Sequence, residues 1–97
     1  MKIQTRESVN YSNDEFFGIV IPLIEEKIEQ FKKSNNCGGC IQMWLGYKQG
    51  LNTHRVLQDQ IEALSAELNE AGWINHSAHM QTDERTGENQ IYIVLYL

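Results

Sequence analysis

The sequence predicts an α+β fold of helix–strand–helix–strand–strand order, with two helices on one face of a three-stranded sheet. The last eight residues, 90–97, are apolar or aromatic on both sides of an extended chain, which is typical of a central strand. Residues 57–71 place leucine and isoleucine at helical spacing. Turn-forming sequences separate these segments from two further alternating runs. Together these patterns indicate a two-layer α/β sandwich.

The N-terminal residues 1–11 alternate only weakly between apolar and polar side chains. Ile3, Thr5 and Val9 are compatible with a short edge strand. A short extra strand before the first helix is therefore an alternative within the predicted fold.

A first helix is predicted from a capping box to about Asn35. The Ser12 hydroxyl can accept a backbone N–H in the first turn, and the Glu15 side chain can reach back to Ser12. Pro22 costs about 3 kcal/mol inside a helix, so either the helix kinks there or it begins at Pro22 after an extended piece. The capping box favours the kinked helix. Its buried stripe would contain Phe16, Val20, Leu23, Ile24, Ile28 and Phe31.

Two further runs alternate with the period of a strand, residues 40–47 and residues 73–81. The polar residues 82–89 then form a hairpin loop that leads into the last strand. Residues 57–71 form the second helix between the first two strands. Asn52 or Thr53 would cap its start, and a glycine follows its last residue.

The topology follows from the connections between these strands. A right-handed crossover through the second helix makes the first two strands parallel, and the hairpin makes the last strand antiparallel to the second. The last strand is apolar on both faces, so it should lie in the centre of a mixed sheet with strand order 1-3-2. Both helices would cover the face that carries Ile41, Met43, Leu45, Ile74, Met80, Ile91, Ile93 and Leu95.

The opposite face of the sheet would be left open. Its predicted residues are Gln42, Trp44, Lys48, Asn75, Ser77, His79, Tyr92, Val94 and Tyr96. Large aromatic side chains on an uncovered face usually mark an interface. We therefore expect Trp44, His79, Tyr92 and Tyr96 to form a binding surface.

Length and composition restrict the function. Ninety-seven residues suit a single domain, 1–97. The net charge of −5 disfavours non-specific binding to nucleic acid. No run of residues is apolar enough to serve as a signal peptide or to span a membrane, so a cytoplasmic protein is expected. No catalytic motif or phosphate-binding loop is present, and we expect neither enzymatic activity nor a cofactor.

Cys37 and Cys40 are separated by two glycines and allow three interpretations. We favour a turn in which the glycines supply positive φ. Redox chemistry is disfavoured because the motif follows a helix, and the negative end of a helix raises a thiol pKa. A zinc site would combine these cysteines with His76 and His79. The two histidines lie three residues apart on a predicted strand, so they should point to opposite faces.

The leading functional hypothesis is a non-enzymatic protein-interaction module that forms a homodimer or binds and inhibits a partner protein through the open aromatic face. One alternative is a binder of small ligands or single-stranded nucleic acid on the same face, and another is an acidic mimic of nucleic acid. The layout is also typical of small accessory proteins of bacteria and phages, although no motif carries that comparison.

Overall fold

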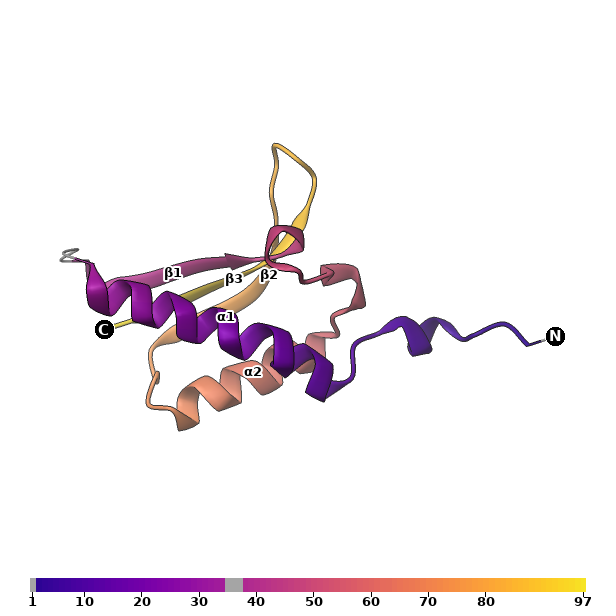
Figure 1. Cartoon of the computed structure of the whole chain (residues 1–97), viewed down its shortest axis with the longest axis horizontal. Helices are drawn as coiled ribbons and strands as arrows, with labels where there is room; N and C mark the ends of the chain where they lie inside the picture. The colour runs from indigo at the N-terminus through magenta and orange to yellow at the C-terminus, as the bar shows by residue number, and fades with distance from the viewer. Residues whose placement is uncertain (1, 35–37) are drawn as a thin grey trace.

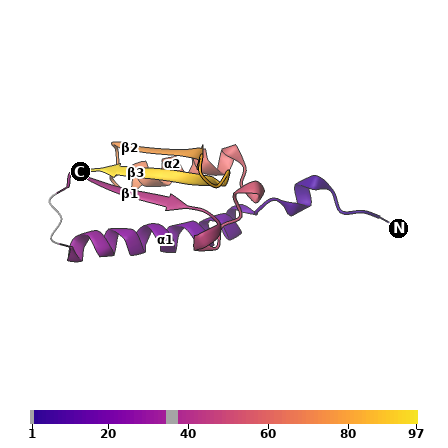
Figure 2. The same cartoon turned by 90° about the horizontal axis from the view of Figure 1, so that it is seen from above.

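Residues 2–34 and 38–97 are described by the structure, a computed structural model (Figure 1). Its helices are α1 (Asn13–Lys33) and α2 (Gln58–Glu70), and its strands are β1 (Cys40–Leu45), β2 (His76–Thr82) and β3 (Asn89–Tyr96). Short 3₁₀ helices cover Arg6–Val9, Tyr47–Gln49 and Thr53–Arg55. The predicted order of helices and strands is confirmed, with the two helices on one side of the sheet (Figures 1 and 2).

Helix α1 begins at the predicted capping box and continues through Pro22. The Ser12 Oγ accepts the Glu15 backbone N–H at 3.1 Å, and the Glu15 Oε1 accepts the Ser12 backbone N–H at 3.0 Å. Pro22 removes the N–H that would bond to the Gly18 carbonyl, but both residues are exposed, so water can take that place. The helix ends at Lys33, slightly before its predicted end.

Strand β3 lies between β1 and β2, which confirms the predicted strand order (Figure 2). The description of the sheet as mixed was wrong. The strands run in the predicted directions, with β1 and β2 parallel to each other. Because β3 separates them, both hydrogen-bonded pairs are antiparallel.

The hydrophobic core lies between the sheet and the helices. Ile91, Ile93 and Leu95 of β3 are completely buried in it. The helices contribute the buried residues Phe16, Val20, Ile24, Ile61, Leu64 and Leu68. The other predicted members of the α1 stripe, Leu23, Ile28 and Phe31, are partly buried against the same cluster.

The N-terminal segment does not add a strand to the sheet. Residues 6–9 form a 3₁₀ helix instead, and the segment before it extends away from the sheet and helices (Figure 1). Ile3 is 91% exposed, so it gains nothing from burial that would hold an edge strand in place. Tyr11 is the one residue among residues 2–11 that belongs to the core. It is buried, and its hydroxyl accepts the Asn52 backbone N–H at 3.0 Å.

The boundaries of three predicted elements also differ. Strand β1 ends at Leu45, and Tyr47 lies outside the core at 80% exposure. Asn52 caps the short 3₁₀ helix that follows it, whereas α2 begins after Leu57 with Gln60 reaching back to the Leu57 backbone N–H. Ile74 is 76% exposed rather than buried, because the chain is still turning after α2 and β2 begins only at residue 76.

Candidate functional site

An aromatic row crosses the three strands on the face of the sheet turned away from the helices. The register places Trp44 of β1 and His79 of β2 on either side of Tyr92 of β3. The Trp44 and Tyr92 rings are stacked, with centroids 4.1 Å apart and an interplanar angle of 27°. The His79 ring meets Tyr92 edge-on at 5.7 Å and 79°. The row is therefore a connected cluster in which the rings hold one another in position.

We call this surface of the sheet the open face. It consists of Cys40, Gln42, Trp44, Ser77, His79, Gln81, Gln90, Tyr92, Val94 and Tyr96, which alternate with the core residues along the three strands. Trp44 is 40% exposed and Tyr96 is 49% exposed. The expected aromatic surface is thus present on the expected side of the sheet.

Tyr96 belongs to the open face but not to the aromatic row. It pairs with Cys40 at the far end of β1, and Val94 lies between Tyr96 and Tyr92 on the same side of β3. Val94 is only 4% exposed although it faces away from the helices. Its cross-strand neighbours are Gln42 and Ser77, so an apolar side chain is buried within the open face itself.

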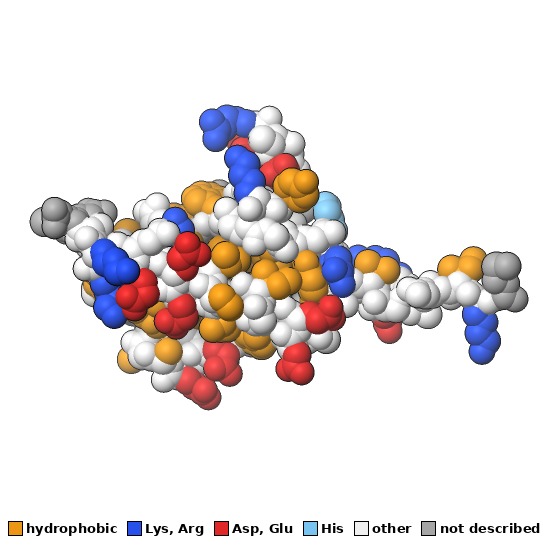
Figure 3. Space-filling view, in the orientation of Figure 1, with side chains coloured by type: hydrophobic (Ala, Val, Ile, Leu, Met, Phe, Trp, Pro, Cys, Tyr) orange, Lys and Arg blue, Asp and Glu red, His pale blue; other side chains and the backbone are white. Residues whose placement is uncertain are grey.

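The strands carry no charged side chain in any of their residues. By contrast, α1 contains five of the thirteen acidic residues and α2 contains four, so nine of thirteen belong to the helix layer. Figure 3 shows most of the acidic side chains in view over that layer, together with Lys and Arg side chains at one end of it. The net charge of −5 is therefore not spread over the open face.

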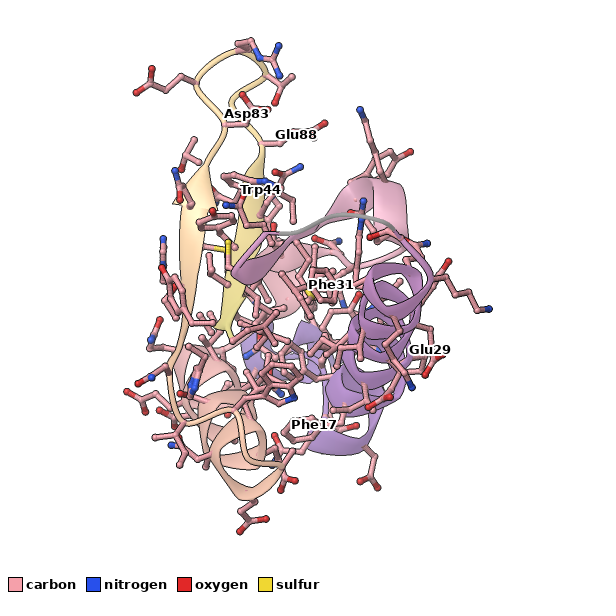
Figure 4. The ribbon with its side chains drawn as sticks, turned by 90° about the vertical axis from the view of Figure 1, so that its left-hand side faces the viewer. Phe17, Glu29, Phe31, Trp44, Asp83 and Glu88 are labelled. Carbon is pink, nitrogen blue, oxygen red and sulfur yellow. The ribbon has the colours of Figure 1, made fainter. Side chains whose placement is uncertain are left out.

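A depression of about 520 Å³ lies at the end of the open face beside Trp44. Lys48 forms one wall, and the loop between β2 and β3 forms the other with its residues 82–85. Gln81 and Gln90 complete the lining. Figure 4 shows Trp44 below this loop, with Asp83 and Glu88 on the two sides of its base.

The loop above the depression is closed by its own backbone. The Asp83 N–H donates to the Glu88 carbonyl at 2.7 Å, and the Gly87 N–H donates to the Asp83 carbonyl at 2.7 Å. Gly87 has a φ of 73°, which favours glycine at this turn. The Asp83 Oδ1 accepts the Arg85 backbone N–H at 2.9 Å, while the Arg85 side chain is 91% exposed. The Arg85 Nε also lies 3.9 Å from the Asp83 Oδ1, so the one cation of this loop is paired with one of its carboxylates.

The residues considered for zinc do not converge. Cys37 lies outside the described residues. Cys40 and His79 both face away from the helices, but Cys40 pairs with Tyr96 at one end of β1, whereas His79 lies two strands away, beside Tyr92. His76 points to the opposite face, as its position on the strand predicted. Within residues 2–34 and 38–97, no group of three or more His, Cys, Asp and Glu side chains could hold a metal ion.

His76 instead connects α2 to β2, a contact that the sequence did not reveal. Its Nδ1 lies 2.6 Å from the Trp73 carbonyl oxygen, and its Nε2 lies 2.5 Å from the Ser65 Oγ. Because a carbonyl only accepts, the neutral ring carries its proton on Nδ1 and accepts the Ser65 hydroxyl at Nε2. The two bonds fix the chain where it turns from helix to strand. Nothing in the spacing of residues 65 and 76 indicates this pairing.

Across the described ranges, neither helix has the length and apolar character needed to cross a membrane. Comparisons with protein-family models, with curated proteins and with solved structures found no match.

Proposed function

We propose that this chain is a non-enzymatic protein-interaction module whose contact surface is the open face. The observation that carries the proposal is a solvent-accessible sheet surface with an aromatic row and no charged side chain. A sheet face that only meets water more often displays charged residues and threonine. Aromatic side chains and uncharged polar groups are the composition expected for the centre of a protein–protein interface.

The geometry of the row suits such a contact. Trp44 and Tyr92 are already ordered by their stacking, so little rotamer entropy is lost when a partner covers them. Tryptophan and tyrosine are also the residues that most often dominate interface energetics. Gln42, Ser77, Gln81 and Gln90 surround the row with hydrogen-bonding groups suited to a polar rim. The partner is another protein or a second copy of this chain.

The test is a Trp44→Ala, Tyr92→Ala double variant, compared with the wild type by sedimentation velocity and by the profile of proteins that co-purify from the native host. Loss of the wild-type association is expected. Tyr47→Ala is the matched control, because Tyr47 is an aromatic residue at 80% exposure outside the open face. A folded double variant with the wild-type sedimentation and partner profile would rule out the proposal.

A second candidate, supported by the depression beside Trp44, is a binder of a small ligand or of single-stranded nucleic acid. Lys48 and Arg85 line that depression together with Trp44, and a cation beside an aromatic side chain can hold a phosphate next to a stacked base. Asp83 and Glu84 line the same depression and oppose an anion there. Titration of a short oligothymidylate, followed by Trp44 fluorescence in a Trp73→Phe background, tests this candidate. Binding that falls steeply with salt and disappears in Lys48→Gln, Arg85→Gln would support it, whereas unchanged fluorescence would exclude it.

A further inference from the structure

Strand β2 forms one border of the sheet, and no described element lies beyond it. In Figure 2, α2 lies behind the sheet, and α1 runs alongside the β1 border. The two borders therefore differ. The β1 border adjoins α1 through a groove lined by Lys27, Gln30 and Phe31. No described helix or strand lies beyond the β2 border in Figure 2.

The backbone groups that β2 turns outward can be identified from the hydrogen bonds at its two ends. The Tyr96 N–H donates to the Asn75 carbonyl, and the Asp83 N–H donates to the Glu88 carbonyl, so residues 75 and 83 bond toward β3. Bonding alternates along an antiparallel ladder, and seven consecutive pairs join β2 to β3 without a bulge. The N–H and C=O groups that point away from the sheet therefore belong to His76, Ala78, Met80 and Thr82.

This border lacks the features that usually keep strand edges apart. Exposed edges are commonly protected by lysine, by other inward or edge charges, by proline or by a bulge. The sequence of β2, His-Ser-Ala-His-Met-Gln-Thr, contains no proline and no Asp, Glu, Lys or Arg. A second copy that approaches here meets no like charge from the strand itself, although the whole chain carries −5.

We propose that β2 pairs with β2 of a second copy about a two-fold axis, which joins the two sheets into one of six strands. Centred on His79, antiparallel pairing matches His76 with Thr82 and Ala78 with Met80 of the other copy. Each of these residues turns its backbone groups outward, so every outward donor meets an outward acceptor. Side chains also stay on their own faces, because paired residues have numbers of the same parity. The pairing surface is the backbone edge of β2, which borders the open face of the proposed function, and pairing places the open faces of both copies side by side.

A charge-exchange experiment tests this pairing. Ser77 and Gln81 lie on the open face at the border, and the proposed register places Ser77 of one copy opposite Gln81 of the other. A Ser77→Lys, Gln81→Lys variant and a Ser77→Glu, Gln81→Glu variant should each self-associate roughly tenfold or more weakly than the wild type. Mixed in equal amounts, the two variants should form a one-to-one dimer in sedimentation and native mass spectrometry. Circular dichroism checks that each variant folds.

Gln30→Lys is the matched control, because it places a lysine on an exposed position of α1, outside both β2 and the open face, and should leave the dimer intact. Amide hydrogen exchange of the wild type gives an independent readout. The amides of His76, Ala78, Met80 and Thr82 should become protected as the protein concentration rises.

Three results would overturn the pairing. The first is that the wild type stays monomeric at about 100 μM. The second is that both charged variants still form the dimer. The third is that the amides of these four residues exchange equally fast at every protein concentration. A dimer lost in Trp44→Ala, Tyr92→Ala but kept in the charged variants would contradict the edge pairing and support the open face instead. Loss of edge pairing leaves the proposed function standing, so the two proposals fail separately.

Discussion

The indole ring of Trp44 lies stacked on the phenol ring of Tyr92, at 4.1 Å between centroids, although the two residues are 48 positions apart in the chain. The antiparallel register of β1 and β3 makes them direct neighbours on the open face. Cross-strand pairs of this kind stabilise a sheet and restrict the rotamers of both rings. The same contact therefore contributes to the fold and prepares the surface for binding.

A double-mutant cycle measures the coupling between these two rings. The free energies of unfolding of Trp44→Ala, Tyr92→Ala and the double variant should give a coupling of about 0.5–1.5 kcal/mol. Tyr96 shares the face but lies outside the row, so Trp44→Ala and Tyr96→Ala should be additive within about 0.5 kcal/mol. Equal coupling in both cycles would contradict the stacking.

Truncation of the central strand tests the placement of the core. Ile93 is completely buried, and Ile93→Ala should lower the free energy of unfolding by about 2–5 kcal/mol in urea titrations. Ile74→Ala is the control. The alternating pattern predicts burial for Ile74, but the structure leaves it 76% exposed, so its truncation should change stability by less than about 0.5 kcal/mol. A large loss of stability in Ile74→Ala would show that Ile74 is buried, and it would contradict the start of β2 at residue 76.

The Ser65–His76 bond makes a prediction about protonation. Nitrogen NMR of the imidazole should show the tautomer with its proton on Nδ1, because the Trp73 carbonyl accepts from that atom. Ser65→Ala should destabilise the protein by about 1 kcal/mol. Ser77→Ala removes a hydroxyl from the other face and should have a smaller effect. Observation of the Nε2–H tautomer in neutral His76 would refute the arrangement.

The capping box predicts a specific dependence on pH. The backbone N–H of Ser12, with further contributions from the Ser12 hydroxyl and Arg55, holds the pKa of Glu15 below its ordinary value of 4.5. A lowered pKa in the folded state means that the charged carboxylate favours folding. Its contribution is complete above pH 4.5 and disappears as the pH falls through the lower folded pKa. Proton NMR titration should give a Glu15 pKa below 4.5, and the stability difference from Glu15→Gln should vanish in acid.

The strand order could be predicted from the sequence because residues 91–97 are apolar or aromatic on both faces, a pattern typical of a strand with a neighbour at each edge. Strict alternation also identified Trp44, His79 and Tyr92 as residues of one face. Alternation gives the side of a residue but not its distance from others. Tyr96, four residues from Tyr92 and about 13 Å along the strand, could not be excluded from the row in this way.

The contacts that the sequence did not reveal are mostly polar and long-range. Gln60 is 2% exposed, and its Nε2 donates to the Tyr11 carbonyl at 2.6 Å. Leu51 and Thr53 are buried in a segment whose composition indicates a surface loop. No local period marks such residues, because their burial depends on segments that meet only in the folded chain. The Ser65–His76 bond has the same origin.

Hydroxyl-radical footprinting of the wild-type protein tests the central claim most directly, because it reports the exposure of individual side chains without mutation. We predict that Trp44 and Tyr92 react several-fold more slowly in the associated protein than in the dilute, isolated chain. Tyr47, which is exposed outside the open face, should react at the same rate in both states. Unchanged reactivity of Trp44 and Tyr92 in a demonstrated complex that does not form through the β2 edge would contradict the assignment of the open face as the contact surface.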